Sequence, residues 1–141
     1  SLSVNAQDTN TPETEVKQVI ITFFEGFHQG DVESMKALLR SPEDALETAF
    51  KTPDGSFKVG TQTMQKLLDA IANRPKEARW EEKLIDFKIQ VDGSLAHVWT
   101  PYEFWFNGKL SHCGANAFTL AKIGSDWKIL HLIDSRRSDC N

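Results

Sequence analysis

The last sixty residues constrain the fold more than any other part of the chain. Three turn signals, Asp92-Gly93, Asn107-Gly108 and Gly124-Ser125, separate four runs rich in Val, Ile, Phe, Trp and Thr. This spacing predicts a meander of four antiparallel strands. Runs of about ten residues are longer than average strands, which favours a strongly curved sheet over a flat one.

The first half of the chain has the periodicity of helices. Apolar side chains recur at three- and four-residue steps from Thr14 to Gly30, which predicts a long amphipathic helix with a stop at glycine. Two more helices are expected, a short one after Asp31 and one over Thr61–Asn73, with a small hairpin between them over Ala45–Lys51 and Ser56–Val59. The order predicts an α+β domain in which three helices pack on one face of a mainly antiparallel sheet.

The composition indicates neither nucleic-acid binding nor a membrane span. The chain has 141 residues, enough for one domain, and 40% of them are apolar. A net charge of −4 gives no electrostatic reason to bind nucleic acid. The longest apolar run is far short of the roughly 20 residues that a membrane span requires.

The beginning of the chain bears on location. Val4-Asn5-Ala6 is typical of a signal-peptide ending, which predicts a periplasmic or secreted protein; the alternative is a mobile polar end of a cytoplasmic one. Cys113 and Cys140 fit no CxxC site and could pair in an exported protein, a question the sequence leaves open. We expect disorder over residues 1–13, the domain over 14–137 and a tail over 138–141.

Strand register predicts which residues face the helices. If the turns are two-residue loops, the even-numbered residues from Ala96 to Phe104 point inward, and the side-chain period of two assigns the rest of the meander. The inner face is then apolar at one end and polar at the other. Small side chains opposite the bulky Phe23 and Phe27 of the first helix leave room for a cavity. The predicted ligand-binding residues are Thr100, Tyr102, Cys113, Asp134, Arg136, Phe23 and Phe27.

Two interpretations of the polar end remain. Asp134 and Arg136 can form a structural ion pair with the Tyr102 hydroxyl as a further hydrogen-bond donor, or the same groups can meet a ligand. Neither interpretation assigns a catalytic residue, and no cofactor is expected.

The opposite face of the sheet mixes charges with large aromatic side chains, which is typical of a subunit interface. There the register opposes Glu103 to His112, as a salt bridge or an acid–base pair. The histidines of this face are too widely spread to predict a metal site. Pro101 is a place where a bulge could exchange the two faces.

Several segments together resemble the NTF2-like superfamily. They are Phe27-His28-Gln29-Gly30-Asp31, the strand Val98–Phe104, the hairpin Asn107-Gly108-Lys109 and the closing segment Leu120–Ile129 with its Trp-Lys-Ile ending. The chain is most similar to the SnoaL-like and lumazine-binding branches over about residues 14 to 137. The resemblance implies a cone, a curved sheet wrapped around the first helix with a deep pocket, usually dimeric through the outer sheet face.

The resemblance implies three functions. The first is binding of a small, partly apolar molecule in the pocket between the first helix and the concave sheet face. The second is a cofactor-free isomerase, dehydratase or cyclase that works by acid–base chemistry with Tyr102 and Asp134. The third is a non-catalytic dimeric association domain.

Overall fold

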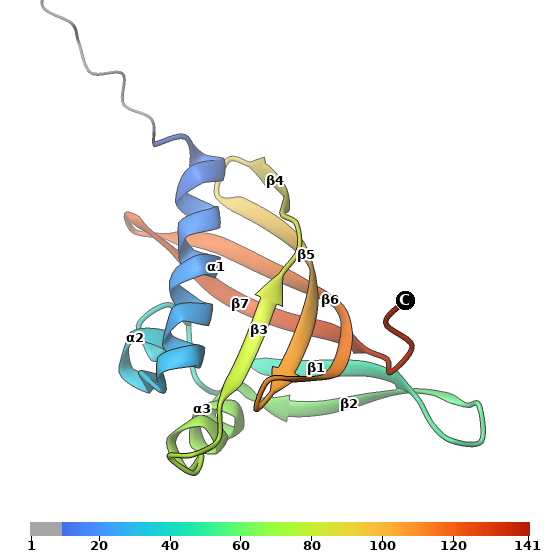
Figure 1. Cartoon of the computed structure of the whole chain (residues 1–141). Coiled ribbons are helices and arrows are strands. Elements are labelled where there is room, and N and C mark those ends of the chain that lie inside the picture. Colours follow the sequence, from blue (N-terminus) through green and yellow to red (C-terminus); the bar gives the residue numbers. More distant parts are fainter. Residues whose placement is uncertain (1–9) are drawn as a thin grey trace, which may run out of the picture.

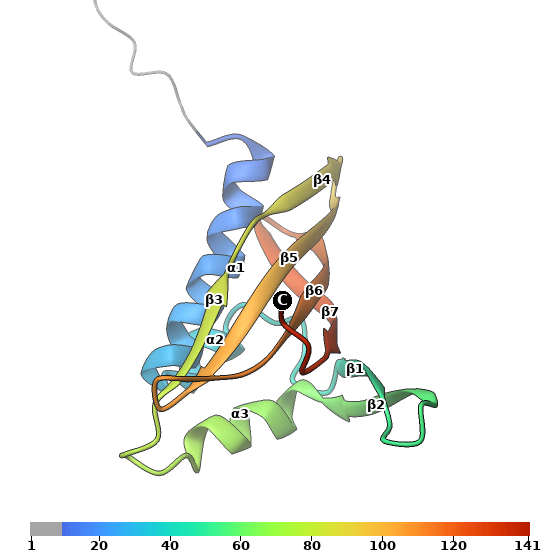
Figure 2. The same cartoon turned by 45° about the vertical axis from the view of Figure 1, so that its right-hand side comes forward.

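The computed structural model describes residues 10–141, in which one helix lies along the concave face of a curved seven-stranded sheet (Figure 1). In the view turned by 45°, α3 lies below α1 and the sheet, beside β1 and β2 (Figure 2). The elements are α1 (Pro12–Gln29), α2 (Val32–Lys36), β1 (Ala45–Lys51), β2 (Phe57–Thr63), α3 (Met64–Ala72), β3 (Trp80–Leu84), β4 (Lys88–Asp92), β5 (Leu95–Phe106), β6 (Lys109–Ile123) and β7 (Asp126–Arg136). The predicted α+β cone is confirmed.

Helix α1 begins two residues before the predicted start. The Thr11 side chain accepts a hydrogen bond from the Thr14 backbone N–H at 3.1 Å, and Pro12 occupies the first turn, where its missing N–H costs nothing. The helix ends at Gly30, whose φ of 75° is a left-handed conformation that glycine adopts without strain. Its buried stripe faces the sheet and consists of Val16, Ile20, Phe23, Phe24, Gly26 and Phe27.

The first predicted meander run is two strands rather than one. β3 pairs with Tyr102–Phe106 and β4 pairs with Leu95–Trp99, both antiparallel to β5, and residues 85–87 between them belong to neither strand. At the other edge, β1 pairs in parallel with β7, so the hairpin of β1 and β2 joins the sheet in the order β2-β1-β7-β6-β5-β3. The third helix is shorter than predicted because β2 continues to Thr63.

A bulge in β6 changes the register that simple counting gives. Phe106 pairs with Lys109 as a two-residue turn requires, but Phe104 pairs with His112, so Ser111 has no partner of its own. One unpaired residue reverses the direction of every side chain beyond it. The prediction for β6 was therefore wrong: His112, Asn116 and Phe118 point inward, with Cys113, Ala115, Ala117 and Thr119 on the outer face. The Pro101 position carries no bulge.

A second bulge restores the predicted direction along part of β7. Thr119 pairs with His131 but Leu120 pairs with Ile129, which leaves Leu130 unpaired. Asp134 and Arg136 therefore face inward as predicted, and so do Trp127 and Ile129, which the simple register placed outside. Ile129 is fully buried, and Leu130 is not.

The core lies at the end of the sheet where α1 begins and runs along the middle of the helix. Phe118 is fully buried and makes edge-to-face contacts with Phe23 and Phe24 at 5.9 and 6.0 Å between ring centroids. Within residues 10–141, no helix is both long and apolar enough to cross a membrane. The predicted signal-peptide ending and most of the predicted disordered segment lie outside the described residues.

Candidate functional site

A cavity of about 370 Å³ lies at the other end of the concave face, between the end of α1 and the sheet. Phe27, Trp80 and Phe104 form an aromatic wall, with ring centroids 5.9 to 6.4 Å apart. The polar lining comes from neighbouring strands and consists of Thr48, Gln62, Glu82, His112, Asn116, Asp134 and Arg136. The size is that of a site for a small organic molecule.

Glu82 is the most perturbed acid of the cavity. Burial raises the pKa of its carboxyl group to about 8, the Asp134 charge adds to the rise, and a 3.0 Å hydrogen bond from the Asn116 amide opposes it. The backbone is fixed as well, because the Glu82 N–H donates to His28 Nε2 at 2.9 Å. Near neutral pH the cavity therefore holds a protonated carboxyl group that can both donate and accept a hydrogen bond.

Asp134 is held by hydroxyl groups and not by the predicted ion pair with Arg136. Thr48 donates to Asp134 Oδ1 at 2.6 Å, and the Tyr102 hydroxyl lies 3.0 Å from Asp134 Oδ2. Of the four ion pairs found in residues 10–141, none includes Arg136. The structural ion pair proposed from the sequence is therefore absent from the described part of the chain.

Tyr102 stands behind the cavity wall. Its side chain is 2% exposed, and its hydroxyl also lies 2.8 Å from the Ser135 carbonyl oxygen. The Ser135 backbone also packs directly against Gly114, where a Cβ would collide with the Ser135 carbonyl. Burial raises the pKa of Tyr102, and the Asp134 charge adds to the effect, so the phenol is a structural donor.

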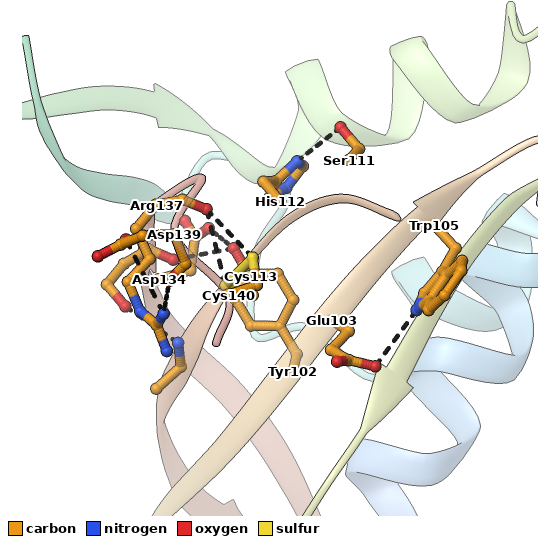
Figure 3. Close-up of a disulfide and its surroundings, with 12 residues drawn as sticks. Tyr102, Glu103, Trp105, Ser111, His112, Cys113, Asp134, Arg137, Asp139 and Cys140 are labelled. Atoms are coloured by element: carbon orange, nitrogen blue, oxygen red, sulfur yellow. Dashed lines mark hydrogen bonds and ion pairs between the residues drawn. A yellow bond between two sulfur atoms is a disulfide. The ribbon is translucent and has the colours of Figure 1, made fainter. Parts of the chain in front are cut away.

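His112 enters the cavity because of the first bulge. Its ring stacks on Phe104 with centroids 4.9 Å apart, and burial together with the Arg136 charge lowers its pKa to about 4. The imidazole is therefore neutral at pH 7. The predicted pairing of His112 with Glu103 was wrong: Glu103 accepts a hydrogen bond from Trp105, and Nδ1 of His112 lies 3.1 Å from the Ser111 hydroxyl (Figure 3).

The predicted site residues divide into two groups. The cavity lining includes Phe23, Phe27, Asp134 and Arg136, whereas Thr100 and Tyr102 are buried behind it. Cys113 was placed wrongly, because the bulge turns it to the outer face, where it forms a disulfide with Cys140 (Figure 3). The disulfide joins the end of the chain to β6, and the backbones of Cys113 and Arg137 exchange two hydrogen bonds beside it.

The comparison with protein families agrees with this geometry. Residues 16–136 match the SnoaL-like domain. The chain belongs to the SnoaL-like domain family. A search of curated proteins found no match, and none of the comparisons specifically supports the lumazine-binding branch.

Solved structures similar to this SnoaL-like domain share the NTF2-like fold. One NTF2-like protein of unknown function, from Pseudomonas putida, has a TM-score of 0.69 at 13% identity, over 92% of this chain and 89% of that one. A second NTF2-like protein, from Cytophaga hutchinsonii, has a TM-score of 0.66 at 16% identity, over 91% of this chain and 99% of that one. An NTF2-like protein from Streptomyces avermitilis, whose proposed activity is that of a dehydratase, has a TM-score of 0.62 at 19% identity, over 90% and 99%. Identities this low establish the fold alone.

Reasoning from the sequence missed Glu82, His112 and Asn116 of this SnoaL-like domain, and only for Glu82 was a signal available. The signal was present: Trp80, Glu82 and Leu84 alternate with exposed residues, so a period of two places Glu82 on the same inward face as its apolar neighbours. A carboxyl group in that position must be paired or protonated. His112 and Asn116 carried no such signal, because they depend on the bulge at Ser111.

Proposed function

We propose that this SnoaL-like domain binds a small, partly apolar molecule in the cavity between α1 and the concave sheet face. The main support is the cavity of about 370 Å³, which has an aromatic wall on one side and polar groups, including Glu82, His112 and Arg136, on the other. A protonated Glu82 and a neutral His112 offer hydrogen bonds without requiring a charge on the ligand. Phe27, Trp80 and Phe104 suit a flat apolar body.

Blocking the cavity tests this proposal. Phenylnaphthylamine, an uncharged aromatic probe, becomes fluorescent in apolar surroundings and should bind the wild-type protein saturably with one site per chain. Ala70 lies on α3 and lines the cavity, whereas Ala72 lies on the same helix, is also exposed and does not line it. Ala70→Trp should weaken binding at least about 10-fold and Ala72→Trp should leave it unchanged. Absence of saturable binding, or equal effects of the two variants, contradicts the proposal.

Acid–base catalysis in the same cavity is the second candidate. Its support is that Glu82, with a pKa of about 8, and the hydrogen-bonded Asp134 are two carboxyl groups in one cavity held in different environments. A protonated Glu82 can donate to a carbonyl oxygen while a second group accepts a proton from carbon. Glu82 then takes the role that the family resemblance implied for Tyr102, which does not line the cavity.

The test for catalysis uses two conservative variants and a panel of enolisable ketones and hydroxylated carbonyl compounds. Glu82→Gln should abolish proton exchange at carbon, which is measured as incorporation of deuterium from heavy water. Its affinity for the probe should stay within about 2-fold of the wild-type value. Tyr102→Phe should retain exchange. If the wild-type protein exchanges no substrate of the panel, the binding function stands alone.

Dimerisation through the outer sheet face is part of this proposal. Leu95 and Trp99 on β5 are 55% and 44% exposed on that face, and Ile123 at the end of β6 is 48% exposed. Apolar side chains of this size are typical of interface cores. Sedimentation velocity should report a dimer that Trp99→Glu dissociates; a wild-type monomer would leave an association function without support.

Export is the remaining element of the proposal. The Cys113–Cys140 disulfide supports it, since such bonds persist in oxidising compartments. Intact-mass measurement of protein from its own host, before and after reduction and alkylation, should find both cysteines protected from alkylation until the protein is reduced. Free thiols in freshly isolated protein would favour the cytoplasmic alternative.

A further inference from the structure

The mouth of the cavity carries an arginine that no carboxylate neutralises. Arg136 lines the aromatic cavity and also a wider outer depression of about 920 Å³, and the two spaces share Thr48, Gln62 and His112 as well. Its side chain is exposed, and within residues 10–141 it takes part in no ion pair and no hydrogen bond that the structure resolves. A guanidinium group at this junction has donors available for a ligand.

The backbone that carries Arg136 is fixed on both sides. Arg136 pairs with Phe50 of β1, and the next residue, Arg137, exchanges two backbone hydrogen bonds with Cys113. The Cys113–Cys140 disulfide fixes the same place covalently. The strand end is therefore rigid, and only the side chain has to be ordered when a ligand binds.

The charges around the mouth favour an anion there. The outer depression is lined by Lys51, Arg136 and Arg137 against one carboxylate, Asp139, in a chain whose net charge is −4. Arg137 is the partner of Asp139, at 3.9 Å, which leaves Lys51 and Arg136 without an acidic partner in the described residues. The wall therefore has the opposite sign to the protein as a whole.

Neither acidic group inside the cavity forms an ion pair with Arg136 in the described residues. Asp134 accepts hydrogen bonds from Thr48 and Tyr102, and Glu82 is bound by the Asn116 amide, so both carboxyl groups have partners other than Arg136. The cavity wall behind Arg136 is aromatic. The cavity and the outer depression together therefore suit a ligand that has an anionic group at the mouth and an apolar body inside.

We infer that the ligand is an amphipathic organic anion, with one or two rings in the aromatic cavity and a single carboxylate-like group at the mouth bound by Arg136. This inference rests on the proposed binding function and names the class of molecule that the cavity takes. The planar guanidinium group suits a carboxylate or sulfonate through two parallel hydrogen bonds.

Two probes that differ by one charged group test the inference that Arg136 binds an anionic group of the ligand. Anilinonaphthalene sulfonate carries an anion on the same aromatic body as the uncharged phenylnaphthylamine. Arg136→Gln should weaken binding of the sulfonate about 10-fold and change binding of phenylnaphthylamine less than about 2-fold. Arg79→Gln is the matched control, because Arg79 is exposed and lines neither space. It should change neither affinity.

The outcomes separate this inference from the function on which it rests. Selective loss of sulfonate binding in Arg136→Gln, with both affinities kept in Arg79→Gln, supports the inference. If both probes bind the wild-type protein and Arg136→Gln affects them equally or not at all, the inference falls and the binding function stands. If neither probe binds the wild-type protein, both fall. Circular dichroism of each variant identifies any change that comes from misfolding.

Discussion

The two ends of the concave face share one helix and one sheet but are stabilised differently. At the closed end, Ile20, Phe118 and Ile129 are fully buried and belong to one hydrophobic core. At the open end the same strands carry Asp134 and His112, and a cavity takes the place of packing. There hydrogen bonds and a disulfide hold the strands together. The difference indicates that one end contributes mainly to stability, whereas the other leaves the cavity in which we propose that a ligand binds.

The largest expected effect comes from truncating the closed end. Phe118→Ala should lower the free energy of unfolding by about 3–5 kcal/mol, because the side chain is fully buried and its removal leaves a void. Phe27→Ala at the cavity should cost less, about 2 kcal/mol, since that ring already borders open space. Urea denaturation measures both values. Equal losses would remove the distinction between the two ends.

The disulfide at the open end should contribute nearly as much to the free energy of unfolding as the Phe118 side chain does. The Cys113–Cys140 bond spans a sequence separation of 27 residues, so Cys140→Ser should lower the free energy of unfolding by roughly 3 kcal/mol through the greater entropy of the unfolded chain. Thermal unfolding of this variant with and without reductant checks the value. A wild-type melting temperature insensitive to reductant would indicate that hydrogen bonds alone hold this end.

Glu82 should give the open end a pH dependence that the closed end lacks. Because burial raises its pKa from 4.5 to about 8, the folded state keeps a proton that the unfolded chain releases. Stability should therefore fall as pH rises from about 4.5 to about 8, and Glu82→Gln should remove about 2 kcal/mol or more of this loss. Urea titrations at several pH values measure the slope. An unchanged slope in the variant would place the carboxyl group in contact with solvent.

The sequence contained enough to predict most of the fold and four of the cavity-lining residues, Phe23, Phe27, Asp134 and Arg136. The turn signals and helical periodicity are local properties, so the α+β cone and the inward side of β5 follow from them. The two bulges leave Ser111 and Leu130 without partners, and neither position carries a Gly or Pro that would mark it in the sequence. His112 and Asn116 were therefore missed, while the second bulge left Asp134 and Arg136 on the predicted side.

The smallest expected effect distinguishes residues behind the cavity wall from residues on it. Tyr102→Phe removes a buried hydroxyl that serves Asp134 and the Ser135 carbonyl, which should cost about 1–2 kcal/mol of unfolding free energy. Binding of phenylnaphthylamine should not change, because Tyr102 does not line the cavity. A fall in probe affinity larger than about 3-fold with unchanged stability would move Tyr102 into the binding site.

The most direct test of the account is where an apolar probe lies on the protein. Isotope-filtered nuclear Overhauser spectra of the phenylnaphthylamine complex should connect the probe to the rings of Phe27, Trp80 and Phe104 and to the side chain of His112. Contacts confined to Leu95 and Trp99 on the outer face would contradict the cavity as the binding site.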